Sequence, residues 1–347
     1  MLHGFINLHK PHNWTSHDCV ARVRRLLNTQ KVGHGGTLDP LATGVLPLAV
    51  GKATRLLQYL PEGKAYRAIV RFGLTTSTDD LEGTVVQQRS AAHLQRQQVE
   101  ALFTQFVGAI AQTPPSYSAV QVDGQRLYDL ARKGKAVEAP VRQVVIHQLH
   151  SRRWHSGDQP ELTVDVVCGP GTYIRSLARD LGEAVGTGAT LVGLVRSHSN
   201  GFDLEESITL EDLATALERE TFMPVTAGMV MQHLQAIALP SALARRWCLG
   251  QKLALEEVAP YVGTQPIQTF MAVPIRVLDE TTQTFLGIAE FRAGSPTADT
   301  PTSASATPTE TDASQQSGDT GDTTDEATAA SGFVFAPKRV FVSPEDL

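Results

Sequence analysis

Apolar residues recur at every second position along two segments of the chain, and each such pattern predicts a half-buried strand. The first runs over residues 66–72 and the second over residues 162–168. Side chains along a strand point alternately to its two faces, so each segment is expected to turn one apolar face toward a core. A shorter strand is predicted at residues 5–8, close to the N-terminus.

Helical spacing of apolar residues predicts three helices around these strands. One follows Ser16, which we take as its N-cap, and a strongly amphipathic one is expected over residues 99–110. The third begins after the strand at 162–168, with Thr172 as its cap. Arg175 therefore lies in the first turn of a helix, where a cation opposes the helix dipole, and this predicts a carboxylate partner for it.

A second domain is predicted from about residue 240, because short strand-like segments recur from there to the C-terminus and suggest a small barrel. A tract at residues 295–331 interrupts it. This tract holds seven acidic residues, no lysine or arginine, and no aromatic residue. Such a segment has too little apolar surface to form a core, and we expect it to be disordered.

The composition of the chain limits the classes of protein to which it can belong. The chain has 347 residues, enough for two domains, and its net charge of −6 becomes +1 without the acidic tract. The first ninety residues carry eleven lysines and arginines against six acids, which permits nucleic-acid binding. No apolar run is long enough to span a bilayer, and the N-terminus shows no secretory signal. Three widely spaced cysteines, without a CxxC pair, suggest neither disulfides nor a zinc site and fit a reducing cytoplasm.

The most unusual stretch is the loop from Gly33 to Gly44, with four glycines, one aspartate and one proline in twelve residues. Pro40 keeps Asp39 out of helical geometry and so fixes how its carboxylate is presented. A single carboxylate on such a loop, with cationic residues on both sides, suggests an ionised nucleophile or a metal ligand. An aspartate that only caps a turn is the structural alternative.

Five motifs, in order, resemble the TruB family of bacterial tRNA pseudouridine synthases, over roughly residues 3–215. The loop at 33–44 resembles the family signature GHxGTLDPxATG. The other four are Lys10-Pro11 with Thr15-Ser16, Lys64-Ala65-Tyr66, Gly171 to Arg175, and Gly188 to Arg196. Asn13 stands where the family usually has glycine, and asparagine tolerates the left-handed backbone such a position requires.

The resemblance implies an α+β pseudouridine synthase fold with a mixed, mostly antiparallel sheet and a C-terminal β-rich, PUA-like domain. Residues 1–240 would form the catalytic domain, in which residues 112–140 are a thumb-like RNA-binding segment. Residues 241–347 would form the PUA-like RNA-binding domain, interrupted by the acidic insertion 295–331.

The implied reaction is the isomerisation of uridine 55 in the tRNA T-loop, by base flipping and without a cofactor, a nucleotide or a metal. Asp39 would be the nucleophile, or a base that helps to form a glycal intermediate, and Arg175 would keep it ionised. Tyr66 would stack on the flipped base and handle the C5 proton. The implied RNA-binding residues are His34, Tyr173, Leu194, Lys10 and Lys64. The partner would be the T-arm of tRNA, and the protein a cytoplasmic monomer without a membrane partner.

Other functions are compatible with parts of this pattern. A non-catalytic RNA-folding protein could keep the same scaffold, and a folding role could also accompany catalysis. A guide-RNA-dependent relative shares the aspartate loop, although the segment at 112–140 favours the stand-alone enzyme. A glycoside hydrolase needs two carboxylates, and no second acid accompanies the loop. A nucleotide-binding loop would need a GK[ST] ending, which is missing.

Overall fold

The computed structural model describes residues 2–118, 120–122, 124–128, 139–263, 267–271, 273–293 and 333–343. The predicted disordered tract 295–331 lies outside the described residues, as does part of the predicted thumb-like segment 112–140. The chain divides into two compact units, Met1–Val230 and Met231–Leu347.

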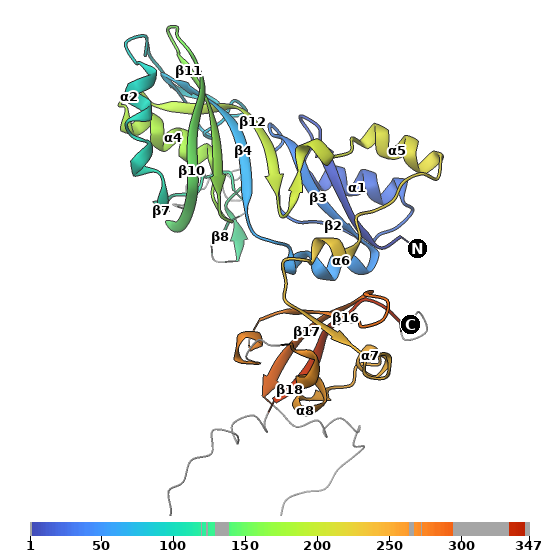
Figure 1. Ribbon diagram of the computed structural model, residues 1–347. Coiled ribbons are helices and arrows are strands. Elements are labelled where there is room, and N and C mark those ends of the chain that lie inside the picture. The colour runs from blue at the N-terminus through green and yellow to red at the C-terminus, as the bar shows by residue number, and fades with distance from the viewer. Residues whose placement is uncertain are drawn as a thin grey trace, which may run out of the picture. The chain divides into compact units, whose positions relative to one another are not determined.

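The first unit contains most of the regular structure (Figure 1). Its strands are β1 (Gly4–Lys10), β2 (Val32–His34), β3 (Thr43–Val50), β4 (Lys64–Phe72), β5 (Leu74–Thr76), β6 (Val85–Gln88), β7 (Gly108–Gln112), β8 (Gln121–Val122), β9 (Gln125–Arg126), β10 (Arg142–His155), β11 (Glu161–Cys168), β12 (Ala189–Ser199) and β13 (Phe202–Asp203). Its α-helices are α1 (Ser16–Leu26), α2 (Arg96–Glu100), α4 (Ile174–Ala184), α5 (Leu210–Glu218) and α6 (Ala227–Val230). Its 3₁₀ helices are η1 (Gly51–Tyr59), η2 (Phe103–Gln105) and η3 (Leu204–Glu206).

One large sheet organises this unit. Its strand order is β1-β3-β12-β4-β11-β10-β7, and β2 and β13 pair with β3 and β12. Within it, β3 and β12 run parallel, and the other neighbouring strands run antiparallel. The prediction of an α+β fold with a mixed, mostly antiparallel sheet is confirmed.

Two apolar clusters pack the sheet against its helices. Around α4, Leu181 joins the apolar faces of β4 and β11, whose alternate residues are buried as the sequence pattern predicts. At the other end, Val20 and Val23 of α1 and Leu213 of α5 pack on β1 and β3. Helix α4 packs on β12 and β4, whereas α1 lies beside β2 and α5 beside β1 in the other half of the unit (Figure 1). The sheet thus carries the loops between its strands on a rigid base.

The predicted amphipathic helix over residues 99–110 is wrong. Helix α2 ends at Glu100, η2 follows, and Ile110 lies on strand β7, which pairs with β10 at the sheet edge. Gly108 has φ +98°, a conformation that no α-helix contains. Apolar side chains from a short helix and from a strand reach the same core here, and their combined spacing resembles one helix.

The second unit consists of β14 (Ala236–Leu239), α7 (Ser241–Cys248), β15 (Leu253–Ala254), α8 (Leu255–Val258), η4 (Ala259–Tyr261), η5 (Ile267–Phe270), β16 (Ile275–Asp279), β17 (Phe285–Ala293) and β18 (Phe333–Val340). Its five strands form one sheet in the order β14-β16-β17-β18-β15, packed around the buried Trp247. The division precedes the expected boundary at residue 240, because β14 pairs with β16. Among the described residues, no helix combines the length and apolarity needed to cross a membrane.

Candidate active site

The end of the loop that carries Asp39 lies against Arg196 of the neighbouring strand β12. Thr43 and Gly44 at the start of β3 pair with Val195 and Arg196 of β12. Gly44 has φ +103°, and a Cβ there would lie 2.3 Å from the backbone oxygen of Arg196. Only glycine combines that backbone conformation with so close an approach of two strands.

The Arg196 side chain then binds both arms of the same loop. It is completely buried. Its Nη1 donates to the oxygen of Thr37 at 3.1 Å, its Nη2 to the oxygen of Gly36 at 3.1 Å, and its Nε to the oxygen of Val45 at 2.7 Å. A buried guanidinium requires such acceptors, so the loop can hardly rearrange without exposing an unpaired charge.

A second buried cation holds the far side of the loop. Lys10 is completely buried, and its Nζ donates to the oxygens of Pro11 (2.8 Å), Trp14 (2.6 Å) and Pro40 (3.3 Å). The prediction that Lys10 contacts RNA is therefore not supported, because its ammonium faces backbone carbonyls and not solvent. Asn13 has φ 62°, the left-handed conformation that the sequence suggested for it, and its backbone N–H also donates to Pro40.

Ser16 has a different role from the predicted one. Helix α1 is capped by Thr15, whose hydroxyl accepts from the backbone N–H of Asp18. Ser16 instead accepts a hydrogen bond from the backbone N–H of Leu38, at 2.9 Å. The residue before Asp39 is thereby tied to α1. Similarly, Tyr173 and not Thr172 is the N-cap of α4.

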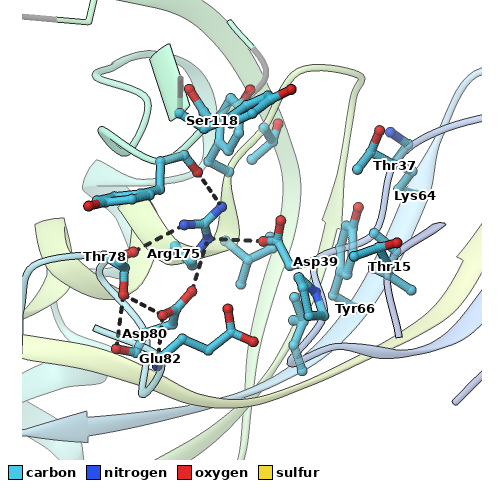
Figure 2. A pocket seen from close by; sticks show the side chains of 18 of the residues that line it. Thr15, Thr37, Asp39, Lys64, Tyr66, Thr78, Asp80, Glu82, Ser118 and Arg175 are labelled. Atoms are coloured by element: carbon cyan, nitrogen blue, oxygen red, sulfur yellow. Dashed lines mark hydrogen bonds and ion pairs between the residues drawn. The ribbon is translucent and has the colours of Figure 1, made fainter. Parts of the chain in front are cut away.

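Asp39 forms the ion pair that the sequence predicted for Arg175. Arg175 Nε lies 2.9 Å from Asp39 Oδ2, and the two side chains are 6% and 34% exposed. The remaining nitrogens of the guanidinium donate to backbone oxygens, Nη1 to Thr78 at 3.1 Å and Nη2 to Tyr117 at 3.0 Å. Figure 2 shows the guanidinium held on all sides, with its edge toward Asp39. The arginine is thus fixed independently of the aspartate that it orients.

Two further carboxylates face the same cavity, and the sequence reasoning missed both. Asp80 is 2% exposed, and its Oδ2 lies 3.5 Å from Arg175 Nε. Burial raises the pKa of Glu82, and Asp80 and Asp39 raise it further. The argument that no second acid accompanies the loop is therefore wrong. The available signal was the group of acids Asp79, Asp80 and Glu82 in one short polar stretch.

The pocket itself is a cavity of about 690 Å³. Besides Asp39 and Arg175, it is lined by four of the predicted site residues: Lys64, Tyr66, Tyr173 and Leu194. His34 lies outside this lining, but its ring meets that of the lining residue His17 edge to face, with centroids 5.6 Å apart. Burial lowers the pKa of His34, with His17 and Arg196 adding to the effect.

Tyr66 and Lys64 sit in a strongly desolvated part of this cavity. Tyr66 is 7% exposed; burial raises the pKa of its phenol, and the charge of Arg196 and a hydrogen bond from it oppose the shift. Burial and Arg196 together lower the pKa of Lys64. Within the described ranges, no group of three or more His, Cys, Asp or Glu residues has the geometry to hold a metal ion.

Comparison with known proteins fits this geometry. Residues 24–174 match the N-terminal domain of the TruB family pseudouridylate synthases, and residues 175–241 match the tRNA pseudouridylate synthase B C-terminal domain. The chain belongs to the TruB family. A tRNA pseudouridine synthase B of Trichormus variabilis is 51% identical over 84% of this chain and 96% of its own length. Proteins of the same name from Acaryochloris marina and Synechocystis are 56% and 52% identical over 72% and 74% of this chain.

Solved structures share the TruB-type fold. A Cbf5-Nop10-Gar1 complex contains a chain with a TM-score of 0.60 and 27% identity, covering 83% of this chain and 78% of that one. A chain of an H/ACA RNP bound to a substrate RNA containing 2′-deoxyuridine also has a TM-score of 0.60, with 24% identity over 83% of this chain and 77% of that one. The second likeness concerns the fold alone.

Proposed function

We propose that this chain isomerises uridine to pseudouridine in tRNA and that its target is the T-loop uridine at position 55. Membership of the TruB family and relatives named tRNA pseudouridine synthase B support the reaction. The observation that carries the proposal is the Asp39–Arg175 ion pair at 2.9 Å, in a cavity lined by Tyr66, Tyr173 and Leu194.

The reaction does not need a redox cofactor, because it rearranges bonds without a net change of oxidation state. The N1–C1′ bond breaks, the base turns, and C5 bonds to C1′. The hydrogen on C5 then leaves as a proton, while N1 gains a proton. Asp39 acts as the nucleophile, and Arg175 binds its carboxylate and holds it aimed into the pocket. No metal or nucleotide is required for any of these steps.

The target base has to leave the stack of the T-loop to reach Asp39, at a cost of a few kcal/mol. Tyr66 stacks on the flipped base and offsets part of that cost, and Tyr173 and Leu194 enclose it. To accept the C5 proton, the Tyr66 phenol would first have to release its own proton. Burial opposes this release by raising the pKa of the phenol, and the charge of Arg196 and a hydrogen bond from it favour the release. His34 fills the space that the base vacates, and Lys64 contacts a phosphate of the RNA.

The rest of the chain holds the T-arm. The thumb-like segment 112–140 would close over the RNA, and residues 241–347 would act as a PUA-like RNA-binding domain. The protein is proposed to work as a monomer in the cytoplasm, where tRNA is modified, without a membrane partner.

The test is the release of tritium from tRNA labelled with [5-³H]uridine, with the native protein and Asp39→Asn measured side by side. Release by the native protein alone, mapped to position 55, is the expected result. Equal release by both would refute the role of Asp39. A native protein that binds tRNA and releases no tritium would instead indicate a non-catalytic RNA-folding protein.

A further inference from the structure

One hydroxyl in the pocket wall has no hydrogen bond of ordinary geometry. Several buried side-chain polar atoms lack a partner within the described part of the chain, and the Ser118 oxygen is the one among them that lines the pocket. Ser118 is 4% exposed, so water does not freely replace the missing partner. A buried hydroxyl without a partner costs stability, and at a binding site a ligand can supply the partner.

The position of this hydroxyl is fixed from both sides. The preceding peptide is held by Arg175, whose Nη2 donates to the oxygen of Tyr117 at 3.0 Å. The Ser118 carbonyl accepts from the backbone N–H of Tyr128 at 3.1 Å. The arginine that aims Asp39 therefore also places the backbone next to Ser118. A group held in this way is preorganised for a ligand.

The hydroxyl lies beside the phenol of Tyr173, which also lines the pocket. Burial raises the pKa of that phenol, and a hydrogen bond with Ser118 opposes the shift. This contact falls outside ordinary hydrogen-bond geometry, so the Ser118 hydroxyl stays available to a ligand. Figure 2 shows Ser118 and Asp80 on opposite sides of Arg175, so the carboxylates gather at one end of the pocket and Ser118 lies at another. A carboxylate repels the carbonyl oxygens of a uracil, whereas a hydroxyl can donate to them.

We infer that Ser118 is a substrate-binding residue whose hydroxyl donates to O2 or O4 of the flipped uracil. This inference rests on the proposed function. The polar edge of uracil loses its water when the base enters the pocket, and its two carbonyl oxygens then need donors. Ser118 supplies one, and the base in turn gives the buried hydroxyl a hydrogen bond of ordinary geometry, which its contact with Tyr173 does not provide.

The first test compares Ser118→Ala with the native protein in the tritium-release assay. We expect kcat/KM to fall about tenfold while the melting temperature stays equal or rises, because the variant loses an unpaired buried hydroxyl. The control is Ser151→Ala, a buried serine of β10 that does not line the pocket, which should keep the native rate. An unchanged rate for Ser118→Ala, or a rate loss that follows a lower melting temperature, would overturn the inference.

The second test identifies the contacted atom with tRNA carrying 2-thiouridine or 4-thiouridine at the target, since sulfur is a weaker acceptor than oxygen. One of the two substitutions should slow the native protein about tenfold and slow Ser118→Ala no further. If both thio substitutions act equally on the two proteins, the hydroxyl does not touch the base. Ser118→Cys, of similar volume, should resemble Ser118→Ala. A native protein without activity on normal tRNA would refute the proposed function itself, which separates that failure from this one.

Discussion

Replacing Gly44 by alanine should damage this protein far more than the same change at Gly108. The two glycines have nearly the same backbone angle, φ +103° and +98°, so the conformational cost of a side chain is nearly the same at both, roughly 1–2 kcal/mol. The two sites differ in the room that is available for a Cβ atom. A Cβ on Gly108 meets nothing within 4 Å, whereas one on Gly44 lies 2.3 Å from the Arg196 oxygen.

The difference in unfolding free energy between the two variants therefore measures the cost of the close contact at Gly44. Ordinary contact distances begin at 3.4 Å, so β3 and β12 would have to separate by about 1 Å at this point. Such overpacking costs roughly 1–3 kcal/mol. Gly108→Ala should therefore lose about 1–2 kcal/mol of unfolding free energy, and Gly44→Ala about 2–5 kcal/mol. The displaced strands carry the base of the Asp39 loop, and a misplacement of about 1 Å can reduce the rate ~100-fold.

Urea unfolding followed by tryptophan fluorescence measures the stability term, since two of the three tryptophans, Trp14 and Trp154, lie in the first unit. Tritium release measures the rate at a temperature where both variants are folded. Equal losses of stability in Gly44→Ala and Gly108→Ala would refute the close approach of the two strands. A folded Gly44→Ala with native activity would refute the claim that this contact sets the loop.

Three further outcomes are expected. Asp80→Asn should lower kcat about tenfold or more without preventing tRNA binding, because Arg175 loses one of its two carboxylates; a native kcat would contradict this. Burial lowers the pKa of Lys10 from 10.5 to about 8. Between these two pH values, the unfolded chain binds a proton at Lys10 that the folded chain lacks. The contribution of Lys10 to the free energy of unfolding therefore rises with pH across this window, by ~3 kcal/mol. The stability difference between the native protein and Lys10→Met should change in that pH window and stay constant below it. Deleting the acidic tract 295–331 should tighten tRNA binding at low salt, and an unchanged affinity would exclude electrostatic repulsion by the tract.

The sequence was most informative where chemistry and chain order coincide. Asp39 was predicted from a loop of glycines with one acid, and the partner of Arg175 from the cost of a cation in the first turn of a helix. Both arguments use residues close together in the chain. The strands at 66–72 and 162–168 were predicted for the same reason, since alternation is a local property.

The sequence was least informative about charged residues that are buried. Lys10, Asp80 and Arg196 are each almost or completely buried. Lys10 was expected to contact RNA, and nothing in the sequence indicated that Asp80 and Arg196 are buried, because a charged side chain becomes buried only where distant segments supply its partners. Arg196 finds acceptors about 150 residues away in the chain, and no local pattern reveals such a pairing. The helix predicted over 99–110 was wrong because the helical spacing of its apolar residues comes from two separate elements, a short helix and a strand.

These buried cations bear on when the active site is formed. Lys10 and Arg196 have no ion pair within the described residues, and their charges are balanced by hydrogen bonds to backbone oxygens, most of which belong to the Asp39 loop or to strand β3 directly after it. Leaving a charge buried without such bonds costs several kcal/mol, so the folded first unit must hold the loop in this shape. Asp39 is therefore positioned when the unit folds and does not depend on RNA for its placement. The binding energy of tRNA is then left for extracting the base and for ordering the contacts around it.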